Sequence, residues 1–374
     1  ASRTTVSKPL TPTALLFLGW LFGWHGSPSG SPGDGAAPHR PVFMSQFSFD
    51  FDPPKPAPVV ASVPAAVPPA ELSPEQMAQR LAEHPDYRVL RRLVPVLDHG
   101  PAPADVPSGL QRVLVLDTET TGLSHASDKI IELAMLLVQV DAATGQPFGP
   151  VDTFEGFEDP GMPIPEVAKQ VTGISDDMVQ GQRLDDAQVQ ALIDRADLVV
   201  AHNAGFDRPF VEARFPGFAH KAWACSFADI DWKAQGAESA KLGALAQDQG
   251  WFYDAHRALV DCHALLQVLA SPQADGSGTG LARLMAAAAQ PSYKLRATGS
   301  PFESKDQLKA RGYRWDANAR VWYCTLASQT LLDAELEWLK AEVYGRRSAR
   351  LDIEAMDSTV RYSARPGRTV EQGL

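Results

Sequence analysis

The sequence has few cysteines, no long apolar run and a shortage of positive charge. Its three cysteines among 374 residues, Cys225, Cys262 and Cys324, form no C-x-x-C pair. They therefore indicate neither a disulfide framework nor a zinc site, and they favour a reduced, cytoplasmic setting. The apolar run near the start, Ala14–Trp24, has 11 residues, whereas a membrane-spanning helix needs about 20. We therefore expect no membrane partner.

Positive charge is scarce overall but unevenly placed. The chain carries 34 Lys and Arg against 45 Asp and Glu, which gives a net charge of −11. Residues 291–374 hold 14 of the basic residues and 11 of the acidic ones, so the acidic excess lies in the rest of the chain. An acidic protein can still bind nucleic acid where divalent cations lie between its carboxylates and phosphate. Net charge alone therefore excludes no nucleic-acid partner.

Composition predicts a disordered N-terminal region over residues 1–70. Residues 1–43 are rich in Gly, Ser and Pro. They either act as an export signal or are extra sequence upstream of a true start at Met44. Residues 53–69 contain seven prolines, which is typical of an extended linker. A short helical extension is expected over residues 71–109, because Ser73, Pro74 and Glu75 form a helix start that precedes spaced apolar residues.

The pattern between residues 110 and 271 predicts an α/β domain. Three early strands, near residues 113–116, 129–141 and 151–157, precede alternating helices and strands. This order indicates a mixed sheet flanked by helices. Three further segments are expected beyond it: a linker and Ala-rich helix (272–290), a small α+β C-terminal module rich in Trp and Arg (291–345) and a loose tail (346–374).

The first predicted strand ends in two carboxylates. In the run VLVLDTETTGL, residues 113–123, four apolar residues precede Asp117 and Glu119. Residues two apart on a strand face the same side, roughly 7 Å from each other along the backbone. The two carboxylates could therefore converge on one hard cation. Alternatively, they cap the following turn or lie solvated at the strand end.

Two more acidic residues strengthen the metal hypothesis. Asp207 lies where a predicted strand passes into a helix, and Asp261 lies inside a later helix. Such positions gather at the carboxyl edge of the strands in an α/β sheet. Four carboxylates there would repel one another unless cations offset their charge. The sequence therefore predicts two divalent metal ions, Mg²⁺ or Mn²⁺, in a phosphoryl-transfer site.

His256 is the candidate general base. It precedes Asp261 by five residues, at the start of the same predicted helix. It could therefore reach a water at the metals without being a ligand, and it must be neutral to accept a proton. His202 and His263 are rivals: His202 is expected to be structural, and His263 faces another side of its helix.

Three segments carry a family resemblance: LDTETTGL, AHNAGFDRPF and HRALVDCHALL. In order and spacing they resemble the three exonuclease motifs of the DEDD superfamily. The His-x-x-x-x-Asp spacing of the third segment is similar to the DEDDh branch, which includes the proofreading epsilon subunit of bacterial DNA polymerase III, ribonuclease T and oligoribonuclease. The resemblance covers about residues 110–271. It implies a ribonuclease-H-like fold and removal of nucleoside monophosphates from 3′ ends.

The resemblance also implies a role for each motif residue. Asp117 would bridge both metal ions, and Glu119 and Asp261 would help to hold the ion that presents the attacking water. Asp207 would support the second ion, and His256 would take the proton from that water. Four further residues stand where family members contact the terminal nucleotide, although capping and core packing explain them equally well: Thr120, Leu123, Asn203 and Phe206.

Two other segments suggest nucleic-acid or protein partners. GYRWDANARVWYC, residues 312–324, resembles a small Trp-rich module found beside such nucleases. Its aromatics and arginines would form either a single-strand platform or a small core with solvated arginines. QFSFDF, Gln46–Phe51, is loosely similar to a sliding-clamp-binding peptide, although it lacks the usual leucines.

Three functions remain open from the sequence. The leading hypothesis is a metal-dependent 3′–5′ exonuclease on single-stranded DNA, in repair or proofreading, with a DNA polymerase or sliding clamp as a candidate partner. Trimming of RNA 3′ ends is the second, because the choice depends on contacts near the sugar 2′ position. A non-catalytic scaffold that binds nucleic acid or a polymerase is the third, and the presence of all five catalytic positions disfavours it.

Overall fold

The computed structural model describes residues 72–103, 109–272, 276 and 278–374. The apolar run at Ala14–Trp24 and the clamp-like peptide lie outside the described residues. The chain divides into two units, with the boundary between Arg80 and Leu81. Every helix among the described residues is too short or too polar to cross a bilayer.

Helix α2 (Pro74–Ala82) begins where the sequence predicts a helix start. The Gln76 amide donates to Ser73 Oγ at 3.2 Å, and the Ser73 amide donates to Gln76 Oε1 at 2.9 Å. This reciprocal pair satisfies two amides that the first turn leaves without helical partners. The helix has no buried residue. Its stability therefore depends on this cap and on local propensity.

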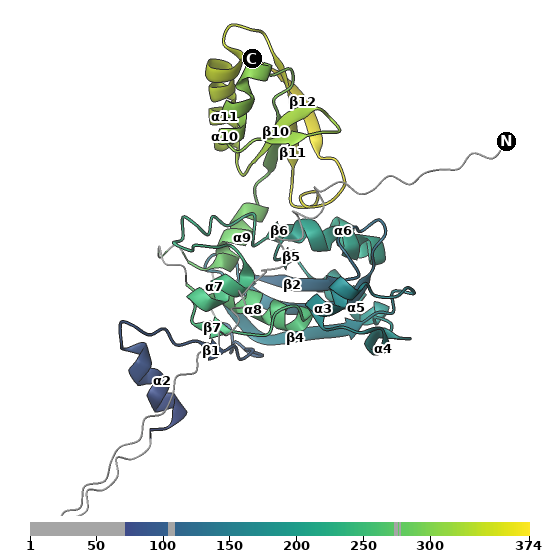
Figure 1. Cartoon of the computed structure of the whole chain (residues 1–374), viewed down its shortest axis with the longest axis vertical. Coiled ribbons are helices and arrows are strands. Elements are labelled where there is room, and N and C mark those ends of the chain that lie inside the picture. Colours follow the sequence, from purple (N-terminus) through teal and green to yellow (C-terminus); the bar gives the residue numbers. More distant parts are fainter. Residues whose placement is uncertain (1–71, 104–108, 273–275, 277) are drawn as a thin grey trace, which may run out of the picture. The chain divides into compact units, whose positions relative to one another are not determined.

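A five-stranded mixed sheet lies at the centre of the second unit (Figure 1), in the order β4-β3-β2-β5-β6. The first three strands in sequence pair antiparallel, whereas β5 and β6 run parallel to β2. The predicted mixed sheet flanked by helices is confirmed. Its strands are β2 (Leu110–Thr120), β3 (Ile130–Asp141), β4 (Pro147–Phe157), β5 (Leu198–Ala201) and β6 (Ala222–Cys225).

Side-chain alternation along β2 divides the interior into two cores. Val113 and Val115 pack in a core with residues of α7, α8 and α9, whereas Leu114 and Leu116 pack in another with residues of α5 and α6. Each face of the sheet is therefore covered by its own helices. The helices of this part are α3 (Glu166–Thr172), α4 (Asp176–Val179), α5 (Asp186–Arg195), α6 (Ala204–Arg214), α7 (Leu242–Asp248), α8 (Ala258–Ala270) and α9 (Gly280–Ala288).

Two short strands tie the preceding segment to this domain. Strand β1 (Arg91–Arg92) pairs in parallel with β7 (Trp251–Phe252). The next residue, Leu93, is buried in the core beside α7 and α8. The segment after α2 is therefore largely extended, and its apolar residue packs at the end of a strand.

A second five-stranded sheet forms the C-terminal region, in the antiparallel order β12-β11-β8-β10-β9. The predicted helix and hairpin are present, but the prediction of a loose tail from residue 346 onward is wrong, because two strands form there. Their register places Leu351 and Ile353 in the core. The elements are β8 (Ser292–Arg296), α10 (Lys305–Ala310), β9 (Arg314–Asp316), β10 (Val321–Leu326), α11 (Gln329–Trp338), the π-helical η3 (Leu339–Tyr344), β11 (Arg350–Met356) and β12 (Arg368–Gly373).

Candidate metal and active site

Three carboxylates lie together at the carboxyl-terminal end of β2. Oxygen atoms of Asp117, Glu119 and Asp261 all lie within 4.8 Å of one another. Asp117 and Glu119 continue the side of β2 that carries Val113 and Val115, and this is the side covered by α8, which contributes Asp261. The period of two along the strand therefore points both carboxylates at the helix. The structure brings three of the predicted site residues together in this way.

Asp207 approaches the end of β2 from the opposite face. It lies in the first turn of α6 and is 2% exposed. Its Oδ1 accepts hydrogen bonds from the Thr118 amide at 3.1 Å and the Thr118 hydroxyl at 2.8 Å. Thr118 points toward α6, whereas Asp117 and Glu119 point toward α8. Asp207 thus lies beside the group of three carboxylates but outside it.

Burial and mutual repulsion hold the pKa values of this group high. Burial, reinforced by Asp207, Asp261 and Glu119, raises the pKa of Asp117 well above its usual range. Burial, with Asp261 as the next cause, raises the pKa of Glu119 to about 8. Burial raises the pKa of Asp207 to about 7, although the Thr118 hydrogen bonds lower it.

Among the described residues, neither Asp117 nor Glu119 forms an ion pair, and Arg257, whose charge lowers the pKa of Glu119, is itself paired with Glu132. Burial of carboxylates without such compensation is costly. Carboxylate oxygens are also the ligands that Mg²⁺ and Mn²⁺ prefer. The residues present therefore fit divalent metal ions, which would hold all four carboxylates ionised.

A fifth carboxylate nearby is fully compensated. Glu132, on β3 directly opposite Glu119, is 0% exposed and accepts Arg257 Nη2 at 2.8 Å and the Ala258 amide at 3.0 Å. Glu155 lies 3.6 Å from the same guanidinium. This network fixes the start of α8 to the sheet. Glu132 and Arg257 were not predicted from the sequence, although a single Glu within the apolar run IIELAMLL was a signal for a buried pair.

His256 precedes α8 in a strained, exposed position. Its φ is 68°, in the left-handed region, and its amide donates to Asp261 Oδ2 at 2.7 Å. Tyr253, also missed by the sequence analysis, donates its hydroxyl to Asp261 Oδ1 at 3.0 Å. Non-glycine residues at positive φ persist only where the surroundings hold them. Here the Asp261 carboxylate holds the His256 backbone and thus ties the candidate base to the acidic group.

Of the two rival histidines, His263 is buried and His202 is half-buried. His202 Nδ1 lies 2.8 Å from Ser226 Oγ, and burial lowers the pKa of His202 to about 4. Burial also lowers the pKa of His263. Both are therefore held neutral, which agrees with structural roles.

The four residues predicted to contact a nucleotide differ in exposure. Thr120 is buried and donates its hydroxyl to the Gly122 carbonyl at 2.6 Å, which shapes the turn after β2. Leu123 is exposed, and Phe206 packs on Phe210 with ring centroids 5.2 Å apart. Asn203 is exposed at the start of α6 with φ 70° and makes no side-chain cap hydrogen bond. Asn203 therefore occupies the N-cap position of α6 without the side-chain hydrogen bond that capping would supply.

The aromatic residues of the C-terminal module divide between its core and its surface. Tyr313 is buried and donates to Glu335, which also pairs with Arg311. Trp315 is 51% exposed, and its ring lies 5.5 Å from that of Trp322. The core interpretation therefore holds for Tyr313 and Arg311, whereas Trp315 remains available to a ligand.

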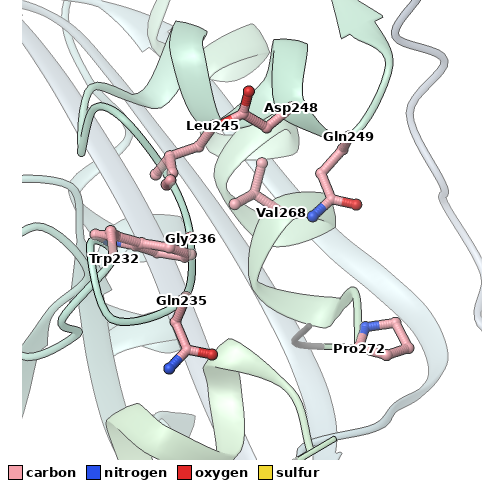
Figure 2. Close-up of a pocket in the computed structure, with 9 residues that line it drawn as sticks. Trp232, Gln235, Gly236, Leu245, Asp248, Gln249, Val268 and Pro272 are labelled. Carbon is pink, nitrogen blue, oxygen red and sulfur yellow. The ribbon is translucent and has the colours of Figure 1, made fainter. Parts of the chain in front are cut away.

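A separate pocket of about 190 Å³ lies between α7, α8 and the segment around Trp232 (Figure 2). Leu245 and Val268 project into it, with Gln249 and Pro272 at its sides. None of the residues that line it belongs to the acidic group. The pocket therefore does not serve as the metal site.

Comparison with known families gives a match over most of the central domain. Residues 114–269 match the exonuclease family RNase_T. The DNA polymerase III PolC-type proteins of Listeria welshimeri and Bacillus subtilis are 41% identical over 103 residues and 38% identical over 109 residues. Each match covers 27% of this chain, which spans 7% of the length of these relatives. These matches confirm the predicted resemblance to this group of exonucleases.

Solved structures of exonucleases also align with the chain. Exonuclease X in complex with 5′ overhanging duplex DNA is 24% identical, with 44% of this chain and 99% of that chain covered and a TM-score of 0.33. E. coli Exonuclease I in complex with a dA16 oligonucleotide is 16% identical, with 50% and 48% covered and a TM-score of 0.36.

Proposed function

Because residues 114–269 form an exonuclease domain, we propose that the chain is a metal-dependent 3′–5′ exonuclease that removes nucleoside 5′-monophosphates from single-stranded DNA in repair or proofreading. The observation that carries the proposal is the group of Asp117, Glu119 and Asp261, whose half-buried carboxylate oxygens lie within 4.8 Å of one another, with raised pKa values for Asp117 and Glu119. A hydrolase that holds divalent ions needs such a group.

Each residue has a distinct task in this proposal. Asp117, Glu119 and Asp261 hold divalent ions on the α8 side, and Asp207 contributes a carboxylate from the α6 side. When bound, the ions supply Lewis-acid polarisation of the phosphodiester and offset its charge. His256 accepts the proton of the attacking water as the water oxygen bonds to phosphorus, the bond to the 3′ oxygen breaks, and that oxygen takes a proton from solvent water. Tyr253 keeps the Asp261 carboxylate oriented through its hydroxyl.

The similarity to PolC-type polymerases supports a DNA polymerase as the partner, and a sliding clamp belongs to the same proposal. Single-stranded DNA is preferred over RNA as substrate because the curated relatives act in DNA synthesis, as their names state. The same setting and the three free thiols support a cytoplasmic location.

Digestion of 5′-labelled single-stranded DNA and RNA of matched sequence, with Mg²⁺ or Mn²⁺, tests the proposal. We expect a ladder that shortens DNA from the 3′ end, and its loss in EDTA and in Asp117→Ala. Faster digestion of RNA would replace the DNA assignment with RNA trimming. Equal digestion by wild type and variant would exclude this site, and binding without digestion would favour a scaffold.

A further inference from the structure

One segment of the C-terminal region lies against the exonuclease domain. The turn at residues 357–363 connects β11 to β12, and we name it the latch segment. Its Ser358 carbonyl accepts the Trp223 amide at 2.8 Å on strand β6. Its Tyr362, at φ 67°, packs against the core on the α6 side of the sheet. The latch segment therefore contacts both the edge of the sheet and the layer of α6.

Arg208 on α6 anchors the latch segment. Its side chain is 0% exposed and lies over the Trp223 ring, 5.1 Å from the ring centroid. Its guanidinium donates to three latch carbonyls, those of Ser358, Thr359 and Arg361. Nε of Arg208 also donates to Glu212 at 2.6 Å. The buried Arg208 guanidinium therefore holds the latch segment against α6, because its removal would leave the three latch carbonyls without a hydrogen-bond donor.

A second arginine makes the reverse contact. Arg361, on the latch segment, is 4% exposed and donates to the carbonyls of Ala287 at 2.6 Å and Gln290 at 3.0 Å. It also lies 3.3 Å from Asp229, which accepts the Tyr362 hydroxyl. Arg208 of the exonuclease domain thus donates to the latch segment, and Arg361 of the latch segment donates to the exonuclease domain. Separating the two parts would leave buried polar groups without hydrogen-bond partners.

Arg208 directly follows Asp207 in the sequence. Successive helical residues point about 100° apart, so the first turn of α6 is bound on two sides. Thr118 holds it through Asp207, and the latch segment holds it through Arg208. We propose that the latch segment positions α6, and that Arg208 is a positioning residue which keeps Asp207 in place for the divalent ions.

In this proposal the C-terminal region contributes to the exonuclease reaction, because it holds Asp207 in position. Groups at a reacting centre must be held within about 0.5 Å of their productive positions. Asp207 depends on a short helix of 11 residues, and the latch segment limits the shift of its first turn. The proposal rests on the proposed function only for its effect on catalysis, since the effect on α6 itself can be measured without substrate.

The test compares three variants of the full chain by hydrogen exchange of the α6 amides without metal and by Mn²⁺ titration calorimetry. Arg208→Met should speed exchange in α6 about tenfold and weaken Mn²⁺ binding about tenfold. Arg365→Met removes a more exposed partner of Glu212 and the Thr359 carbonyl. It should therefore speed α6 exchange and weaken Mn²⁺ binding by only about two- to threefold. If Arg208→Met does not fold, Arg365→Met decides.

Arg311→Met is the matched control. It removes a partly buried arginine that pairs with Glu335 inside the C-terminal module and touches no latch residue. It should lower the melting temperature and leave α6 exchange and Mn²⁺ affinity unchanged. Wild-type exchange and Mn²⁺ affinity in both Arg208→Met and Arg365→Met, or equal changes in the Arg311→Met control, would overturn the inference. A wild type without exonuclease activity would overturn the proposed function alone, because the exchange result still stands.

Discussion

Two buried clusters of charge adjoin the first turn of α6, and they differ in what compensates them. On the side of Asp207, carboxylates lie together and raise one another's pKa. On the side of Arg208, guanidinium groups meet carbonyls and carboxylates that accept their hydrogen bonds. Native interiors satisfy buried polar groups with few exceptions. The difference separates a cluster that supports structure from one that requires an added ligand.

Removing a carboxylate from the unsatisfied cluster should abolish activity without harming the fold. We expect Asp117→Asn to lower kcat about 10³-fold, because several kcal/mol of metal-dependent stabilisation is lost. In EDTA its urea midpoint should equal or exceed that of the wild type, because one repelling charge is gone. A large loss of stability in EDTA would mean that Asp117 belongs to a structural network.

Removing a carboxylate from the satisfied network around Arg257 should instead destabilise the fold. Glu132→Gln should lower the free energy of unfolding by about 3–5 kcal/mol, because Arg257 loses its buried partner. Urea denaturation in EDTA measures this change. Glu155→Gln is the matched control, because Glu155 faces the same guanidinium but is 40% exposed, and it should cost at most about 1 kcal/mol. Equal losses of stability in Glu132→Gln and Glu155→Gln would mean that Glu132 is not the buried partner on which Arg257 depends.

The pH dependence of stability should reverse when metal is added. The folded protein raises the pKa of Glu119 to about 8 and of Asp207 to about 7, so it holds protons that the unfolded chain has already released. Without metal, stability should therefore fall as pH rises from about 4 to about 8, on the order of 1 kcal/mol per pH unit for one such group.

Divalent ions bind the ionised carboxylates, so their stabilising effect should grow over the same pH range. Thermal melts at pH 5, 6.5 and 8, with Mg²⁺ or EDTA, measure both trends. A metal-induced rise in melting temperature that is the same at all three pH values would contradict the assignment of these pKa values to the metal ligands.

The smallest expected change concerns the hydrogen bond to Asp261. Tyr253→Phe removes one donor to this carboxylate, a loss of about 1 kcal/mol that corresponds to roughly fivefold weaker Mn²⁺ binding. Titration calorimetry gives this affinity. Tyr87→Phe, a change at an exposed tyrosine, should leave it unchanged, and an equal loss there would remove the role of Tyr253.

Sequence patterns predicted the sheet well because its signals are local. The run before Asp117 is apolar throughout, and β2 is buried on both faces at Val113–Leu116. The segment from Gly345 onward was misjudged because β12 is exposed along its whole length and carries one large apolar residue, Val370. β12 pairs with β11, and β11 pairs with β8, more than 50 residues earlier in the chain. No local pattern encodes such a partner.

The acidic residues of the site were predictable for the same reason, since strand period and helix position place them. Their partners were not. Glu132, Tyr253 and Arg257 become relevant only when β3 and the start of α8 are brought beside β2. The role of Arg208 depends on carbonyls about 150 residues away, which carry no side-chain signal.

The Ser358 carbonyl also covers the outer edge of strand β6, which ends the sheet. Shortening the chain to the exonuclease domain would uncover the Trp223 amide on an apolar edge strand. Exposed edges of this kind template intermolecular strand pairing. An excised domain would therefore tend to aggregate, and poor solubility of such a fragment would reflect this uncovered edge rather than an unstable catalytic fold.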